Sequence, residues 1–157
     1  MRDAEITARP SAMPWPPILY LATILAALLV DQLRPLGFGI AWPWRSVGLA
    51  VLGAGLGLDL LAIFTLTRHR TTFRPDRGTT RLVMSGPYAL SRNPIYLGNT
   101  IALAGLALAV DNLWLLVALP VVTLAVQKLA IEREERHLSA VFGGTWEAYR
   151  RKVGRWV

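Results

Sequence analysis

The sequence predicts an all-α, polytopic membrane protein with about four transmembrane helices, followed by a C-terminal helical segment that is cytoplasmic or interfacial. Apolar residues make up 54% of the chain and charged residues 17%, whereas a soluble domain usually carries about 25% charged residues. The deficit of charge is concentrated in long uncharged runs, which is typical of helices that span a bilayer. Basic residues are also distributed unevenly among the connecting loops, which is typical of an oriented membrane protein.

Four apolar segments approach the roughly 20 residues that a spanning helix needs. They are residues 15–33, 44–66, 94–110 and 113–131. Pro35 and Gly37 end the first segment. Only Asp111 and Asn112 separate the last two segments, so these two must form a tight antiparallel hairpin.

The distribution of basic residues predicts the orientation. The loop 68–92 contains six arginines and one acidic residue, whereas the hairpin between the last two segments contains no basic residue. Basic loops stay on the cytoplasmic side, so we expect an integral protein of the bacterial inner membrane with both termini in the cytoplasm. We divide this single domain, residues 1–157, into a tail (1–14), two spanning helices (15–66) and a core (67–157).

Composition and placement exclude several kinds of site and partner. The chain has no cysteine, which excludes disulfides and thiolate nucleophiles. Its net charge of +7 comes mostly from arginines beside apolar runs, which indicates anionic lipid headgroups rather than nucleic acid. His69 and His137 lack ligand-like spacing, so no metal site is expected. The patch of Gly53, Gly55 and Gly57 has no preceding strand and indicates close helix packing rather than a dinucleotide loop.

The segment 85–98 carries the first candidate site. It opens with a turn at Gly86, and Asn93 followed by Pro94 is a typical N-cap and first helical residue. A spanning helix therefore begins here, with free N–H groups and its positive dipole end at the membrane boundary. Arg92 stands beside these groups, so the pattern suits an anion such as a carboxylate. The alternative is a capped helix whose arginine contacts a lipid phosphate.

A charged segment continues the fourth apolar run out of the bilayer. Glu132 and Arg136 are four residues apart and can pair on a helix. Glu134 and Glu135 both border the apolar face that Ile131 marks, where a carboxylate can hold an ammonium group or a ribose hydroxyl. The alternative is a solvated run of charges at a helix end.

A third segment, residues 146–156, combines aromatic and basic residues. Trp146, Tyr149 and Val153 share one helical face, and basic residues cover the rest. This pattern fits an amphipathic helix in the membrane interface. The alternative is a simple membrane anchor.

In this order, the three segments resemble the isoprenylcysteine carboxyl methyltransferase and phospholipid methyltransferase superfamily. The resemblance covers about residues 72–157. Its elements are Gly86-Pro87-Tyr88, Arg92-Asn93-Pro94 with Tyr96 and Gly98, Glu134-Glu135 with Leu138, and Phe142-Gly143 with Tyr149 and Val153. Asn93 stands where eukaryotic carboxyl methyltransferases usually have histidine and is similar to the bacterial form. Gly154 stands where many relatives have proline.

The resemblance implies that S-adenosylmethionine binds on the cytoplasmic side, between the start of the third span and the helix after the fourth. The implied cofactor-binding residues are Leu82, Val83, Arg92, Asn93, Tyr96, Leu97, Gly98, Glu134 and Glu135. Arg92 suits the methionyl carboxylate, and Glu134 or Glu135 suits the ammonium group or serves as a general base for a protonated acceptor. These three are the candidate catalytic residues. The candidates for an anionic group of the substrate are Tyr149, Arg151 and Arg155.

The expected function is methyl transfer to a lipophilic small molecule or lipid, through a carboxylate, amine or thiol. Two alternatives stay open. One is an NADPH-dependent reductase of the sterol-reductase type, which has a similar Asn-Pro-x-Tyr region, and the other is a non-enzymatic membrane scaffold. Asp59 lies inside the second span, where it pairs with an arginine, stays protonated or touches substrate. Small residues in the second and third spans permit self-association without demanding it.

Overall fold

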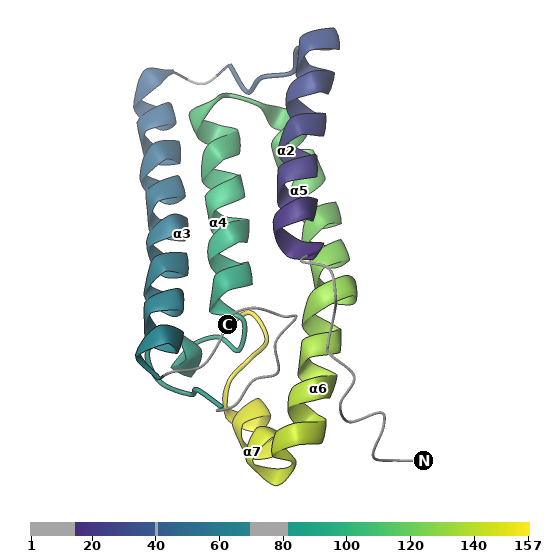
Figure 1. Cartoon of the computed structure of the whole chain (residues 1–157). Helices are drawn as coiled ribbons and strands as arrows, with labels where there is room; N and C mark the ends of the chain where they lie inside the picture. Colours follow the sequence, from purple (N-terminus) through teal and green to yellow (C-terminus); the bar gives the residue numbers. More distant parts are fainter. Residues whose placement is uncertain (1–14, 40, 70–81) are drawn as a thin grey trace.

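The computed structural model describes residues 15–39, 41–69 and 82–157. The expected N-terminal tail and four arginines of the basic loop, Arg70, Arg74, Arg77 and Arg81, lie outside this part of the chain. Within it, every regular element is helical (Figure 1). In chain order these elements are α2 (Trp15–Leu33), α3 (Trp42–Arg68), the 3₁₀ turn η1 (Gly86–Ala89), α4 (Pro94–Ala109), α5 (Leu113–Val126), the π-helical turn η2 (Gln127–Ile131), α6 (Glu132–Phe142) and α7 (Gly144–Lys152).

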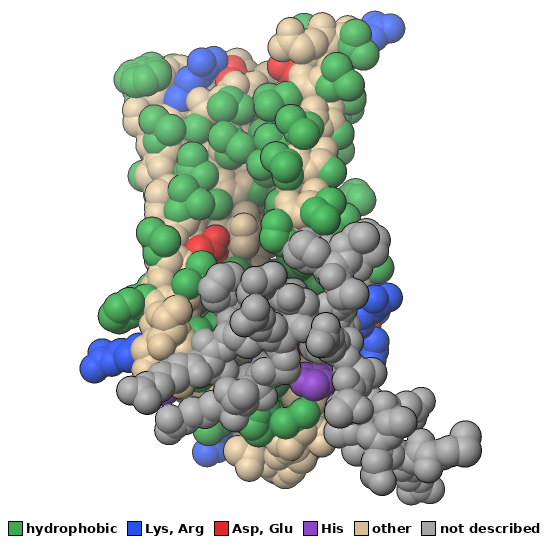
Figure 2. All heavy atoms as spheres, in the orientation of Figure 1, with side chains coloured by type: hydrophobic (Ala, Val, Ile, Leu, Met, Phe, Trp, Pro, Cys, Tyr) green, Lys and Arg blue, Asp and Glu red, His purple; other side chains and the backbone are tan. Residues whose placement is uncertain are grey.

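The lengths of these helices confirm the predicted fold class. By length and composition, α2, α3 and the continuous helix Leu113–Phe142 can each cross a membrane. The fourth apolar helix, α4, is shorter, with 16 residues. On the face that Figure 2 shows, hydrophobic side chains are spread over the helices, and the visible basic side chains lie mainly toward the ends of the bundle. Leu60, for example, is 69% exposed, as expected for a side chain that faces lipid.

The helix order brings α4 between α3 and α5, with α2 beside α5 (Figure 1). The tight hairpin between α4 and α5 is confirmed. Asp111 takes a φ of 57°, and the side chain of Asn112 caps α5 by accepting a hydrogen bond from the Leu115 N–H at 3.0 Å. Asp111 also accepts hydrogen bonds from the Phe38 N–H at 2.8 Å and from Arg45 at 2.9 Å, which ties the hairpin to the α2–α3 connection. We call this the hairpin end of the bundle and the opposite end the site end.

Close packing between α3 and α4 depends on glycines. A Cβ at Gly55 would lie 2.5 Å from the Ala102 nitrogen and 2.6 Å from the Gly98 carbonyl oxygen, so the two backbones nearly touch. The prediction of close helix packing is therefore correct for Gly55. It is wrong for Gly53 and Gly57, which have no atoms within 4 Å of a Cβ position. Helical periodicity explains the difference, because residues two positions away from Gly55 point away from the contact face.

Candidate functional site

The start of α4 is held by the end of the chain rather than by a side-chain cap. Asn93 occupies the N-cap position, as predicted, but its side chain makes no capping hydrogen bond. Its Nδ2 instead donates to the main-chain oxygen of Arg155 at 3.1 Å, and the Asn93 N–H donates to Ser91 Oγ at 3.1 Å. The predicted cap position is therefore correct, but the Asn93 side chain bonds to a main-chain carbonyl of a distant segment instead of capping the helix. Asn93 thus leaves the free N–H groups in the first turn of α4 without a side-chain cap.

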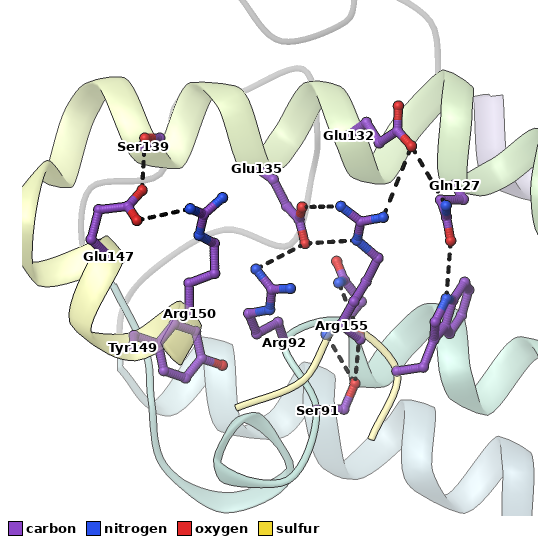
Figure 3. Close-up of polar contacts among 12 residues, drawn as sticks. Ser91, Arg92, Gln127, Glu132, Glu135, Ser139, Glu147, Tyr149, Arg150 and Arg155 are labelled. Carbon is purple, nitrogen blue, oxygen red and sulfur yellow. Dashed lines mark hydrogen bonds and ion pairs between the residues drawn. The ribbon is translucent and has the colours of Figure 1, made fainter. Parts of the chain in front are cut away.

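Residues 153–157, which we call the return segment, run from α7 back to the start of α4. The Arg92 N–H donates to the Gly154 carbonyl oxygen at 3.0 Å, and Ser91 Oγ donates to the Arg155 carbonyl oxygen at 3.2 Å. Trp156 Nε1 donates to Gln127 Oε1, in the π-helical turn, at 3.1 Å (Figure 3). The return segment therefore joins α4 to the helix that carries the acidic residues.

An ion network links α4, α6 and the return segment (Figure 3). Arg155 forms a bidentate pair with Glu135, with Nε–Oε1 at 3.1 Å and Nη2–Oε2 at 2.6 Å. Arg92 Nη1 lies 3.2 Å from the same Oε1. The side chains of Arg92 and Glu135 are only 9% and 10% exposed, so this part of the network is largely shielded from water. Hydrogen bonding to Glu135 raises the pKa of Arg155.

Arg92 keeps two buried donor atoms, Nε and Nη1, that form no hydrogen bond in the described part of the chain. Nη1 lies 3.2 Å from the Glu135 carboxylate, whereas no ion pair is recorded for Nε. The guanidinium carbon of Arg92 lies 5.6 Å from the centroid of the Trp146 ring, which supports the side chain from one side. Burial lowers the pKa of Arg92 from its ordinary value, while the Glu135 carboxylate acts in the opposite direction. A buried unpaired donor is costly, so this site is suited to bind an acceptor group.

Glu134 faces a different neighbour from Glu135. Its Oε2 accepts a hydrogen bond from the Tyr96 hydroxyl at 3.2 Å, which joins α6 to α4. Adjacent residues on a helix point about 100° apart, so the two carboxylates reach different sides of the site. Glu135 is engaged by two arginines, whereas Glu134 contacts the neutral hydroxyl of Tyr96. Glu134 is therefore the carboxylate with capacity for a cationic group.

Trp146 and Tyr149 on α7 pack against the protein. They are 2% and 5% exposed, and their rings meet edge to face at 5.7 Å. The Tyr149 hydroxyl donates to the Tyr88 carbonyl oxygen of η1 at 2.6 Å. Burial raises the pKa of Tyr149 to about 12, with the charge of Arg92 acting in the opposite direction. The predicted aromatic face of this segment is therefore covered by protein, and Tyr149 acts as a neutral donor.

The structure brings most predicted site residues together at the site end. Direct contacts join Arg92, Asn93, Glu135 and Arg155, and a separate contact joins Tyr96 to Glu134. Other candidates stand apart from these contacts. Gly98 packs against Asp59 and Gly55 of α3, Arg151 is exposed on α7, Val83 is buried just before η1, and Leu82 and Leu97 are partly buried.

The structure tests two predictions about the partners of charged side chains, those of Glu132 and Asp59. The expected pair of Glu132 with Arg136 is wrong, because Glu132 instead pairs with Lys128 at 2.7 Å, one turn earlier. The helix leaves Arg136 exposed. The buried Oδ1 of Asp59 has no hydrogen-bond partner among the described residues. Three outcomes were considered for Asp59, and the first of them, pairing with an arginine, is not observed in this part of the chain.

Several contributors to the site were not identified from the sequence. They are Ser91, Gln127, Trp146, Gly154 and Trp156. Gln127 offered the clearest signal, since a lone amide at the end of an apolar run needs a buried partner. Ser91 and Gly154 offered none, because their contacts are to or from the main chain of a distant segment.

Comparisons with known proteins show what the chain is similar to. The chain is 30% identical over 119 residues to the cobalt-zinc-cadmium resistance protein CzcN of Cupriavidus metallidurans, an alignment that covers 76% of this chain and 51% of that protein. The chain thus spans about half the length of this curated relative. No solved structure matches. The family described as phospholipid methyltransferase matches residues 44–145, which include most of α3 and all of α4, α5 and α6. The chain therefore belongs to the phospholipid methyltransferase family, whose members are membrane methyltransferases that generally use S-adenosylmethionine.

Proposed function

We propose that the chain transfers a methyl group from S-adenosylmethionine to a lipophilic acceptor at the cytoplasmic face of the membrane. The observation that carries the proposal is the buried, unpaired Nε of Arg92 beside the uncapped start of α4. Glu134 stands across the same site on α6 with capacity for a cation. A donor site for a carboxylate and an acceptor site for an ammonium group thus occur together, as the amino-acid end of this cofactor requires.

The residues fit the cofactor as follows. Arg92 Nε and the first-turn N–H groups of α4 would hold the methionyl carboxylate, since a helix N-terminus and an arginine both favour an anion. Glu134 would hold the ammonium group. The apolar side chains of Leu82 and Val83 would contact the adenine. When bound, the cofactor supplies a methyl group on a positively charged sulfur, which is a strong electrophile.

The protein has a small chemical task in this reaction. It must bind and orient the two reactants and exclude water from between them. A carboxylate acceptor needs no base, whereas an amine or thiol that arrives protonated must lose a proton. Glu134 is the better candidate for that base, because Glu135 is held by Arg92 and Arg155. The acceptor would be a lipid or a lipophilic small molecule entering from the bilayer, and Tyr149 and Arg151 remain candidates to contact its polar group.

Calorimetry tests the cofactor assignment. Purified protein in detergent would be titrated with S-adenosylhomocysteine and, separately, with NADPH. We expect the first to bind and the second not to bind. Arg92→Ala and Glu134→Ala should each weaken binding by about tenfold or more, which corresponds to about 1.4 kcal/mol. Arg133→Ala, an exposed position on the same helix as Glu134, is the control and should bind normally. Binding of NADPH alone would support the reductase, and binding of neither ligand would refute both enzymatic assignments.

The proposed orientation has its own test. Because the chain contains no cysteine, single cysteines can be introduced without background. Arg136→Cys lies at the site end and Arg34→Cys near the hairpin end. In intact bacterial cells, a membrane-impermeant maleimide should label the second variant and not the first. The opposite pattern of labelling would place the site on the outer face and refute this part of the proposal.

A further inference from the structure

Arg155 was expected to hold an anionic group of the substrate, but its polar groups are engaged within the protein. Its guanidinium takes both carboxylate oxygens of Glu135, and its main-chain oxygen accepts hydrogen bonds from Ser91 and Asn93. The same guanidinium also lies 3.9 Å from Glu132. These contacts join the return segment to both α4 and α6.

The bidentate pair determines how Glu135 can interact with Arg92. Arg155 occupies both oxygens of the carboxylate, at 3.1 and 2.6 Å. Arg92 faces Glu135 only through Nη1, which lies 3.2 Å from the shared Oε1 without forming a hydrogen bond, and its Nε has no partner among the described residues. Without Arg155, the carboxylate would be free to form its own bidentate pair with Arg92, as arginine and carboxylate prefer. A pair through Nε and Nη2, the edge of the guanidinium that Arg155 itself uses, would occupy the Nε donor of Arg92.

We propose that Arg155 is a positioning residue: by occupying both oxygens of Glu135, it keeps the Nε donor of Arg92 available for a ligand. This inference rests on the proposed function, because the ligand is the carboxylate of the proposed cofactor. It also separates the roles of the two adjacent acids. Glu134 contacts the ligand, whereas Glu135 acts through the arginines on either side of it.

A double-mutant cycle tests whether Arg155 acts through Glu135. Arg155→Ala alone should weaken binding of S-adenosylhomocysteine by about tenfold, and in a Glu135→Gln background the same substitution should change affinity by less than about twofold. Arg155→Lys keeps the charge but cannot span both oxygens, so it should restore only part of the affinity. If Arg155→Ala weakens binding equally in both backgrounds, Arg155 contacts the ligand itself and the proposal is overturned. Unchanged affinity in Arg155→Ala overturns it as well.

A second measurement keeps the inference testable when no ligand binds. The Arg92 N–H is bonded to the Gly154 oxygen, so its hydrogen exchange reports directly on the return segment. In Arg155→Ala this amide should exchange at least about tenfold faster, while Arg133→Ala should leave it unchanged. Equal protection in both variants would show that Arg155 does not hold the segment. If the wild type binds no S-adenosylhomocysteine but exchange responds as expected, the proposed function and the role of Arg155 toward the ligand both fail, and only the attachment of the return segment by Arg155 stands. If Arg155→Ala proves too unstable to purify, Arg155→Lys provides the same comparison with a smaller expected change.

Discussion

Gly98→Ala should damage both the packing of α4 and the site that its first turn forms. A Cβ at this position would lie 2.7 Å from the Gly55 carbonyl oxygen and would collide with the Asp59 carboxylate. Ordinary Cβ contacts begin at 3.4 Å, so α3 and α4 must separate by several tenths of an ångström. Gly53→Ala is the matched control on α3, because nothing lies within 4 Å of a Cβ there.

The two variants allow the packing cost to be isolated. Both replace glycine by alanine inside a helix, which stabilises the helix by about 1 kcal/mol. Only Gly98→Ala adds an overpacked contact, which costs about 1–3 kcal/mol. The free energy of unfolding of Gly98→Ala should therefore be lower than that of Gly53→Ala by about 1–3 kcal/mol. Denaturation in mixed micelles, followed by circular dichroism, measures this difference.

The displacement of α4 should also affect ligand binding. Gly98 lies within the first two turns of α4, near Tyr96 and the N–H groups proposed to bind the cofactor carboxylate. We therefore expect weaker binding of S-adenosylhomocysteine by Gly98→Ala and unchanged binding by Gly53→Ala. Equal stability of the two variants would refute the close approach of α3 and α4. Lower stability with normal affinity would refute the link between this packing and the site.

Three further substitutions test separate contacts. Tyr96→Phe removes the hydrogen bond that Glu134 accepts and that keeps the pKa of this buried carboxyl group from rising further, so Glu134 should be protonated more readily and bind a cationic ligand about threefold or more weakly in calorimetry; unchanged affinity would contradict this role. Asp111→Asn removes the charge that Arg45 contacts at the hairpin end; it should lower stability by about 1 kcal/mol and leave ligand binding unchanged, since the site lies at the other end. Tyr149→Phe leaves an η1 carbonyl without its donor and should cost about 1–3 kcal/mol in unfolding experiments. Because the folded-state pKa of Tyr149 is raised to about 12, the stability from its neutral form should be complete below the unfolded value of about 10 and be lost as the pH rises toward 12. Burial raises the pKa of Tyr88 as well, so the readout is the difference between two titrations followed by absorbance at 295 nm: Tyr149→Phe should lack the tyrosine that ionises near pH 12 in the wild type.

The sequence correctly predicted the elements that depend on residues close together along the chain. Runs of apolar residues set the spans, and the two residues between α4 and α5 forced a hairpin. Asn93 followed by Pro94 correctly marked where α4 begins. Helical spacing also predicted that Glu135 borders the face of Ile131, although the arginines that hold Glu135 lie far away in the sequence. The spans, the hairpin and the start of α4 depend on residues that are close together along the chain.

The contacts that form the site could not be predicted from residue spacing, because they join segments that are far apart in the sequence. The Asn93 side chain was free to cap its own helix, yet it bonds to a carbonyl oxygen 62 residues away. Any residue type at position 155 supplies such a carbonyl, so its partner cannot be read from side-chain identity. The π-helical turn at Gln127–Ile131 is a second example. One additional residue per turn rotates everything after it, and no residue type in this stretch predicts it.

The separate engagement of the two acids has a consequence for the charge of the site. Glu135 is held by Arg92 and Arg155, whereas burial raises the pKa of Glu134, with the hydrogen bond from Tyr96 acting in the opposite direction. The amino-acid end of the proposed cofactor is a zwitterion, so its carboxylate would meet Arg92 while its ammonium group would favour the charged form of Glu134. A simple anion would give Arg92 a partner but leave Glu134 without a cation. A lipid phosphate alone is therefore the weaker explanation for the Arg92 donor that has no partner among the described residues.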